Sequence, residues 1–223
     1  MKKPTIRAIF VDFGNVCATF DMKRFVKNTE RAFGVSAEEI QDVLFMKAKD
    51  GGYKGYSPLF MAFECGEIGP VGFFHALTHT LNCEERVDYA TFARLWVDVF
   101  DRENVELDKL LAKLPQKKYL LSNTNTLVHA RHISGCAIVR NHFPTRPDRI
   151  LSYEVGVVKP NPLIYKVALA RAGTKPEQSL FLDDMEENID AWRELGGVGV
   201  VYHAKNDPIA KLKKELRTLG VLK

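Results

Sequence analysis

The chain has 223 residues, of which 46% are hydrophobic and 27% are charged, enough to bury a full core and one further compact unit. Its formal net charge is +4 and its basic residues are scattered, so we predict no nucleic-acid-binding surface. No window approaches the roughly 18 apolar residues of a membrane span, and the four cysteines are far apart. We therefore expect a cytoplasmic protein without a membrane partner, and the oligomeric state stays open.

The first predicted element is a buried strand over residues 6–11, which ends directly before Asp12. Ligands of open parallel α/β sheets bind in the crevice outside the carboxyl ends of the strands. Asp12 is therefore a candidate for chemistry, although an aspartate at a strand end can also serve only to cap the next turn.

A long helical stretch follows from residue 21 to about residue 100, and no strong strand pattern interrupts it. Ser36 and Glu39 have the spacing of a capping box, and the aromatic residues Phe60, Phe63, Phe73 and Phe74 are expected to form a core of this stretch. The predicted helices cover residues 24–33, 37–44, 58–64, 71–81 and 89–100.

Helices and strands alternate again after Asn104. Helices are predicted at 105–114, 126–132, 162–172, 187–195 and from 208, and strands at 118–121, 150–152, 179–182 and 199–202. This order predicts the α/β class: a Rossmann-like parallel sheet core, residues 1–19 and 100–223, with a helical unit, residues 20–99, inserted after the first strand.

Three further polar clusters follow predicted strands or precede predicted helices. They are Ser122-Asn123-Thr124-Asn125, Lys159-Pro160-Asn161-Pro162 and Asp183-Asp184. Each cluster alone has a structural alternative, namely a helix cap, a surface charge or a turn. Together they would place three carboxylates, a lysine and neutral donors at one edge of the sheet, and such crowded carboxylates need a cation.

Mg²⁺ and phosphate are the ion pair that suits these groups. Mg²⁺ takes oxygen ligands, usually one or two carboxylates with substrate phosphate oxygens, which fits Asp12 and Asp184, whereas zinc would require His or Cys. Lys159 and Ser122 can contact phosphoryl oxygens, and Asp12 can attack phosphorus.

The chain resembles the haloacid dehalogenase superfamily of hydrolases over essentially its whole length. The four segments that carry the resemblance are Val-Asp-Phe-Gly-Asn-Val at 11–16, Leu-Ser-Asn-Thr-Asn at 121–125, Gly-Val-Val-Lys-Pro at 156–160 and Phe-Leu-Asp-Asp at 181–184. The first two are most similar to a subgroup that includes hexose-1-phosphate phosphatases. The insertion at 20–99 is similar to the helical cap of that family.

The resemblance implies a role for each matching residue. Asp12 would be the nucleophile and a metal ligand, with the Gly14 carbonyl, Asp184 and the adjacent Asp183 as the rest of the metal site. Phosphate would be bound by Ser122, Asn123 and Lys159.

The chain departs from most phosphatases of this family at Gly14, where they have an aspartate that protonates the leaving group. We expect Asp21 to be a displaced acid and Arg24 to contact the substrate, although Asp21 can instead cap the first helix of the insertion. In the glycine-rich stretch 50–56, Tyr53, Lys54 and Tyr56 are candidate substrate contacts.

The sequence thus predicts a Mg²⁺-dependent phosphatase for a small phosphorylated metabolite, with a sugar phosphate as one candidate. A 2-haloacid dehalogenase and a non-catalytic protein that binds phosphorylated ligands are the alternatives. The Asp183-Asp184 pair argues against a dehalogenase, because extra negative charge would repel a substrate that carries a carboxylate. The sequence does not specify the substrate.

Overall fold

The computed structural model describes residues 5–49 and 51–223, so Asp50 of the glycine-rich stretch lies outside the described residues. Its centre is a five-stranded sheet with the order β7-β6-β1-β8-β9, in which all neighbouring strands are parallel. The strands are β1 (Ala8–Val11), β6 (Lys117–Ser122), β7 (Arg149–Leu151), β8 (Ser179–Asp183) and β9 (Val198–Val201). The predicted parallel sheet is therefore confirmed.

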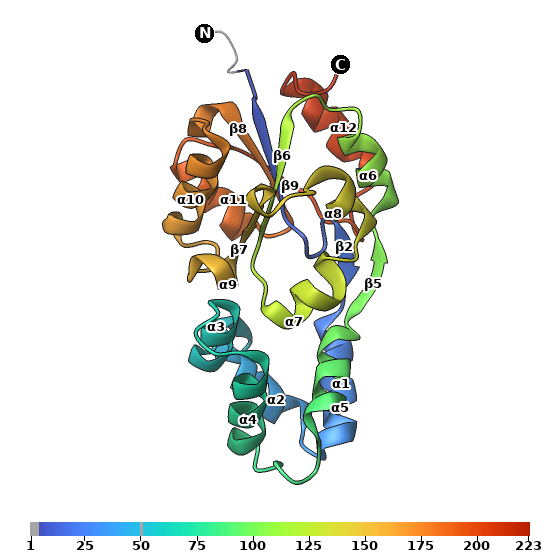
Figure 1. Ribbon diagram of the computed structural model, residues 1–223, viewed down its shortest axis with the longest axis vertical. Coiled ribbons are helices and arrows are strands. Elements are labelled where there is room, and N and C mark those ends of the chain that lie inside the picture. Colours follow the sequence, from blue (N-terminus) through green and yellow to red (C-terminus); the bar gives the residue numbers. More distant parts are fainter. Residues whose placement is uncertain (1–4, 50) are drawn as a thin grey trace.

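Helices cover both faces of this sheet, as Figure 1 shows. One face packs against α6 (Val105–Leu111), α8 (Ala137–His142) and α12 (Ile209–Thr218). The other packs against α10 (Pro162–Ala172) and α11 (Glu186–Glu194). Because both faces of the sheet are covered, its strands are mostly continuous apolar runs. The sequence analysis could therefore identify these strands.

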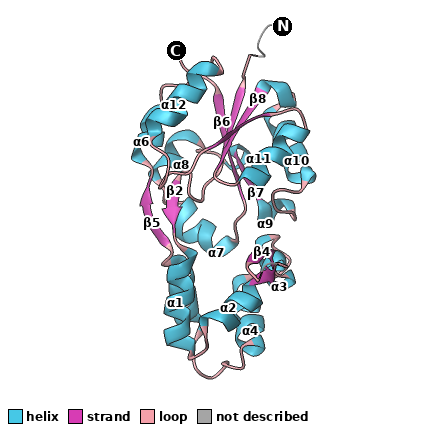
Figure 2. Cartoon of the chain, turned by 180° about the vertical axis from the view of Figure 1, so that it is seen from behind, coloured by secondary structure: helices cyan, strands magenta, loops and turns pink. Residues whose placement is uncertain are grey.

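A second group of helices lies beyond the carboxyl ends of the strands (Figures 1 and 2). The chain enters and leaves this group through two short antiparallel strands, β2 (Ala18–Phe20) and β5 (Phe100–Glu103). Its helices are α1 (Met22–Phe33), α2 (Ala37–Leu44), α3 (Pro58–Glu64), α4 (Pro70–Thr80) and α5 (Tyr89–Val97).

This helical group has an aromatic core of its own. Trp96 lies at its centre, with the rings of Phe25, Phe60, Phe63, Phe73 and Phe92 at centroid distances of 4.8 to 5.7 Å. The predicted aromatic core is confirmed, since Phe60, Phe63, Phe73 and Phe74 are all buried in it. Edge-to-face contacts of this kind add to the stabilisation that burial of the rings provides.

The helical stretch expected over residues 21–100, without a strong strand pattern, contains one short hairpin. β3 (Phe45–Lys47) pairs with β4 (Tyr53–Tyr56) in an antiparallel hairpin, whose turn is closed by a 2.8 Å hydrogen bond from the Ala48 N–H to the Gly52 carbonyl. Both strands are too short and too exposed to show the alternation of apolar and polar residues that identifies a strand.

The remaining elements between these strands and helices are short. They are α7 (Thr126–Val128), which continues into the π-helix His129–Ile133, α9 (Ser152–Val155), and the 3-10 turns Arg146–Asp148 and Pro176–Gln178. The capping box predicted at Ser36 and Glu39 is present. Among the described residues, no helix combines the length and the apolar character needed to cross a bilayer.

Candidate active site

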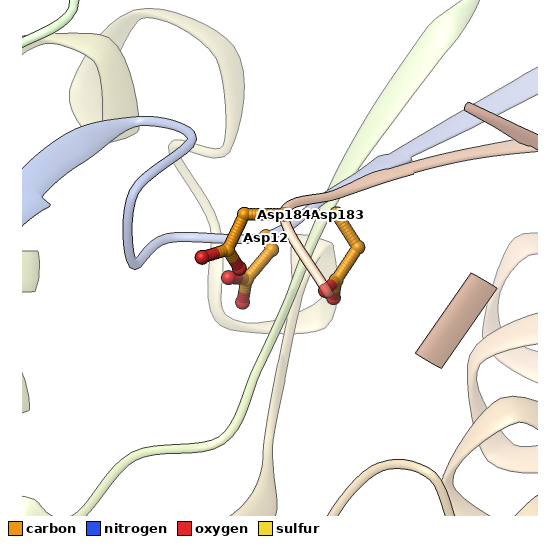
Figure 3. Close-up of side chains that lie close together, drawn as sticks. All are labelled: Asp12, Asp183 and Asp184. Atoms are coloured by element: carbon orange, nitrogen blue, oxygen red, sulfur yellow. The ribbon is translucent and has the colours of Figure 1, made fainter. Parts of the chain in front are cut away.

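The carboxyl ends of the two central strands bring three carboxylates together. β1 and β8 are parallel neighbours with Val11 opposite Leu182, so Asp12 and Asp183 follow at the same level of the sheet. One oxygen from each of Asp12, Asp183 and Asp184 lies within 4.8 Å of the others, a spacing that could hold one metal ion. Figure 3 shows the carboxyl groups of Asp12 and Asp184 next to each other and that of Asp183 to one side.

Lys159 is a buried cation within this cluster. Its Nζ atom lies 2.7 Å from Asp12 Oδ1 and 2.7 Å from Asp183 Oδ2, and it donates to the Leu121 carbonyl at 3.0 Å. Burial alone would lower the pKa of Lys159, but the charges of Asp12 and Asp183 raise it above its ordinary value. The ammonium group has three donors, so in this arrangement all three are occupied by the protein.

Asp183 has a different set of partners from the other two aspartates. Its Oδ1 atom accepts hydrogen bonds from the Met185 N–H and the Asn188 amide, both at 2.9 Å, while Oδ2 accepts from Lys159. The residue is fully buried. These three donors leave Asp183 poorly placed to be a metal ligand, and its contacts instead orient Lys159. These contacts favour a positioning role for Asp183, and the metal role that the sequence predicts for it stays a prediction.

The electrostatics of the cluster call for a further cation. Burial, opposed by the charge of Lys159 and aided by the charges of Asp183 and Asp184, raises the pKa of Asp12 to about 7. Burial and the Asp183 charge also raise the pKa of Asp184. When all are ionised, three carboxylates and one lysine carry two excess negative charges. One divalent cation with oxygen ligands would balance them.

Ser122 and Asn123 follow β6, the neighbour of β1 on its other side. Ser122 is buried, and its hydroxyl donates to the Asn123 carbonyl at 3.2 Å. The Asn123 side chain donates to the Lys159 carbonyl at 3.0 Å and accepts from the Lys159 N–H at 2.7 Å. Both ends of the Asn123 amide thus hold the Lys159 backbone in place, so a phosphate contact of Asn123 would come from its backbone N–H.

Backbone groups after β1 and β6 complete the edge of the site. Among the described residues, the N–H groups of Phe13, Gly14 and Asn123 have no hydrogen-bond partner, and neither does the Gly14 carbonyl. Free N–H groups beside a cluster that needs a cation can receive the oxygens of an anion. The Gly14 carbonyl stays available as the backbone metal ligand that the resemblance implies.

The sequence analysis did not identify the role of Asn15 in holding Asp184. It has a positive φ of 53°, which asparagine tolerates better than most residues. Its amide donates to Asp184 Oδ2 at 3.1 Å and accepts from the Phe20 N–H at 3.3 Å. Asn15 thus fixes the Asp184 carboxylate relative to the loop after β1. An asparagine after a glycine was the available signal, and it points only to a turn.

Phe20 explains why position 14 holds a glycine. A Cβ atom at Gly14 would lie 2.7 Å from Cε1 of the Phe20 ring, which is closer than real contacts allow. An aspartate cannot stand here unless the ring moves.

We expect Gly14→Asp to destabilise the protein by about 1–3 kcal/mol, because the new side chain is forced into the Phe20 ring. The same substitution in a Phe20→Ala background should cost less, since the obstacle is gone. Chemical unfolding of the four proteins in this double-mutant cycle measures the difference. Equal costs in both backgrounds would show that Phe20 does not restrict position 14.

Asp21 and Arg24 are not brought to the carboxylate cluster. Asp21 is the N-cap of α1, where its side chain accepts from the Lys23 N–H at 3.0 Å. Arg24 pairs with Asp101 and donates to the Asp98 carbonyl at 3.3 Å. Neither residue lines the cavities beside the cluster. The capping alternative for Asp21 is therefore the one that the structure shows, and Arg24 ties α1 to the segment that leads into β5.

Two cavities lie between the helical group and the carboxylate cluster. The larger, of about 420 Å³, is lined by Lys159 and Asn123 on one side and by Tyr53, Tyr56 and other residues of the helical group on the other. The smaller, of about 100 Å³, contains Gly14 and Ser122 in its wall. Tyr56 lines both cavities, and Lys54 lines neither. Of the three residues of the glycine-rich stretch expected to contact the substrate, Tyr53 and Tyr56 line a cavity and Lys54 does not.

Glu64 is a second residue that the sequence did not single out. It lies at the end of α3, lines the smaller cavity and is only 5% exposed. Burial raises the pKa of its carboxyl to about 7, opposed by a hydrogen bond from Asn125. No local pattern marks it, because its partner Asn125 is 61 positions away along the chain.

Comparison with known proteins identified curated relatives but no matching family model. The chain is 25% identical over 227 residues to a phosphatase of Mycobacterium tuberculosis, covering 98% of this chain and 97% of that protein. It is 28% identical over 201 residues to a D-ribitol-5-phosphate phosphatase of Bacteroides thetaiotaomicron, covering 86% of this chain and 89% of that protein.

A solved structure is similar over almost the whole chain. It is a HAD family enzyme of Bacteroides thetaiotaomicron in complex with magnesium and inorganic phosphate. The two structures superpose with a TM-score of 0.75 at 25% sequence identity, covering 93% of this chain and 98% of the other.

Proposed function

Because this chain is a haloacid dehalogenase-like hydrolase, we propose that it is a Mg²⁺-dependent phosphatase acting on a small phosphorylated metabolite. The observation that carries the proposal is the cluster of buried Asp12 and Lys159 with half-buried Asp184 at the carboxyl ends of β1 and β8. It combines a nucleophile, a fixed cation and an excess of negative charge beside free backbone N–H groups.

Asp12 is the nucleophile in this proposal. One of its carboxylate oxygens attacks phosphorus while the bond from phosphorus to the leaving-group oxygen breaks, and water then hydrolyses the aspartyl-phosphate. Lys159 keeps Asp12 ionised and oriented through their 2.7 Å contact. The Ser122 hydroxyl and the free N–H groups of Phe13 and Gly14 receive the phosphoryl oxygens.

The donor set fits a magnesium ion. Mg²⁺ would be held by the carboxylates of Asp12 and Asp184 and by the Gly14 carbonyl, and it supplies charge neutralisation and polarises the phosphoryl group. Asp183 supports this arrangement through Lys159, and Asn15 supports it through Asp184.

We propose that the helical group, residues 20–99, acts as a cap. The substrate enters between this cap and the sheet core. The relative from Bacteroides is named for D-ribitol 5-phosphate, which supports a sugar or polyol phosphate as the substrate class. A 2-haloacid dehalogenase is not favoured, because the excess negative charge at the cluster would repel the carboxylate of such a substrate.

Removing divalent ions with EDTA is expected to abolish hydrolysis of p-nitrophenyl phosphate, and added Mg²⁺ should restore it. Asp184→Asn should need at least about 10–100 times more Mg²⁺ for half-maximal rate, because a charged ligand is lost. Rates measured across a Mg²⁺ titration test both statements. Hydrolysis that survives EDTA, or chloride release from 2-chloropropionate without metal, would contradict the proposed function.

A further inference from the structure

The smaller cavity is lined by polar groups of the sheet core on one side and by aromatic rings and a carboxyl group on the other. Its core side contains Gly14, Ser122 and Asn123 from the phosphate end of the site. Its other side is formed mainly by aromatic rings, including Phe20 and Trp96, together with the carboxyl of Glu64. Its volume of about 100 Å³ exceeds the roughly 15 Å³ that one water requires. It therefore has room for a small part of a substrate next to the phosphoryl group.

Glu64 is held at this wall by contacts on both its backbone and its side chain. The Ser152 hydroxyl lies 2.7 Å from the Glu64 carbonyl oxygen and 2.9 Å from the Thr124 carbonyl oxygen. Asn125 donates from Nδ2 to Glu64 Oε1 at 2.7 Å, and its own Oδ1 accepts from the Val128 N–H. Because the Asn125 amide is fixed at both ends, Glu64 Oε1 is fixed as well.

The second carboxyl oxygen of Glu64 has no partner among the described residues. Thr124, which also lines the cavity, has a buried hydroxyl that is likewise without a hydrogen-bond partner there. Buried polar atoms are normally satisfied, so the unpaired Thr124 hydroxyl, beside a carboxyl oxygen that no protein group contacts, points to a ligand or to water in this cavity. In the described part of the chain, no lysine or arginine lines this cavity, which argues against a further anionic group there besides the phosphoryl group.

We propose that Glu64 is a specificity-determining residue that hydrogen-bonds a hydroxyl of the substrate's leaving group, with the aromatic rings packing against its carbon skeleton. This inference rests on the proposed phosphatase function and adds to it the part of the substrate that is recognised.

The state of the carboxyl supports this assignment. With its pKa raised to about 7 by burial, Glu64 exists in both protonation states near neutral pH. It can therefore donate to a hydroxyl or accept from one, as can the Thr124 hydroxyl. A site that offers hydrogen bonds to a hydroxyl discriminates strongly against an analogue that lacks it, because its buried polar groups are then left unpaired.

The test compares glycerol 1-phosphate with n-propyl phosphate, which has the same carbon chain without hydroxyls. We expect the wild type to prefer glycerol 1-phosphate by at least about tenfold in kcat/KM. Glu64→Leu should reduce this preference to near unity while hydrolysis of p-nitrophenyl phosphate continues. Glu67→Gln, an exposed change three positions further along, should leave the preference intact.

Glu64→Gln covers the case in which the leucine variant fails to fold. Glutamine can still accept from Asn125 but has lost the acceptor that faces the cavity, so the preference should fall at least about threefold. Wild-type hydrolysis without a hydroxyl preference, or a preference retained in both Glu64 variants, would overturn the inference alone. A wild type that hydrolyses no phosphate ester would overturn the proposed function and this inference with it. A preference for phosphocholine over its neutral isostere 3,3-dimethylbutyl phosphate would assign the cavity to a cation instead.

Unfolding provides a readout that does not depend on activity. Because the folded-state pKa of Glu64 is raised from 4.5 to about 7, its contribution to stability is present below pH 4.5 and is lost as the pH rises through 7. The unfolding midpoint of the wild type should therefore fall more between pH 5 and 8 than that of Glu64→Gln. Identical pH profiles would show that burial does not raise the pKa of this carboxyl, and the inference would fail.

Discussion

Replacing Asp12 by asparagine is expected to lower kcat for p-nitrophenyl phosphate by about 10⁴-fold or more, because the amide cannot form the covalent phosphoryl intermediate. Folding should be retained, since Lys159 keeps its 2.7 Å contact with Asp183 after the change. Steady-state kinetics measures the loss. Acid-quenched reactions with radiolabelled phosphate ester should label the wild type and not the variant.

A matched control separates the loss of the nucleophile from the loss of one negative charge. Asp190→Asn makes the same chemical change on the exposed side of α11, where Asp190 forms a surface ion pair with Arg193. Its activity should stay within about twofold of the wild type, as is usual for surface positions. If Asp12→Asn keeps more than a tenth of the wild-type rate, Asp12 is not the nucleophile.

The second large effect is expected from Lys159→Met, which removes the cation between two buried carboxylates. Asp12 and Asp183 would face each other without a counter-charge, and loss of one partner from a buried ion pair costs about 3–5 kcal/mol. Turnover should be lost as well, because Asp12 is no longer held ionised. Urea unfolding measured without Mg²⁺ gives the stability, and p-nitrophenyl phosphate gives the activity.

Added Mg²⁺ should return part of the stability of Lys159→Met, since a cation that binds only the folded state stabilises it. Lys166→Met on the exposed side of α10 is the control, and it should change the free energy of unfolding by less than about 0.5 kcal/mol. A loss below 1 kcal/mol in Lys159→Met would mean that the two carboxylates are protonated or solvated in the folded protein.

Local sequence patterns were sufficient for the sheet core. The strands β1, β6 and β8 are apolar runs that end at polar residues, and α3 and α10 have the predicted bounds because a proline stands at the first position of each helix. The hairpin β3–β4 escaped prediction because its three- and four-residue strands are half exposed and pair only with each other.

The sequence by itself determined that Asp12, Ser122, Lys159 and the Asp183-Asp184 pair stand at strand ends or helix starts, since these positions depend on periodicity and on neighbouring residues. Only the tertiary structure decided which contacts each of these residues makes. Asp183 is buried against Lys159 while Asp184 faces Asn15. Their different roles follow from packing between distant segments.

The same reason applies to the groups that the sequence did not identify. The Phe20 ring closes the space at Gly14, and Glu64 meets Asn125 across the boundary between the helical group and the sheet core. Such contacts depend on how separate elements approach one another, and a pattern within any one element carries no information about that approach. The sequence therefore determined the elements and the types of chemical group, and the packing of those elements decided which group does what.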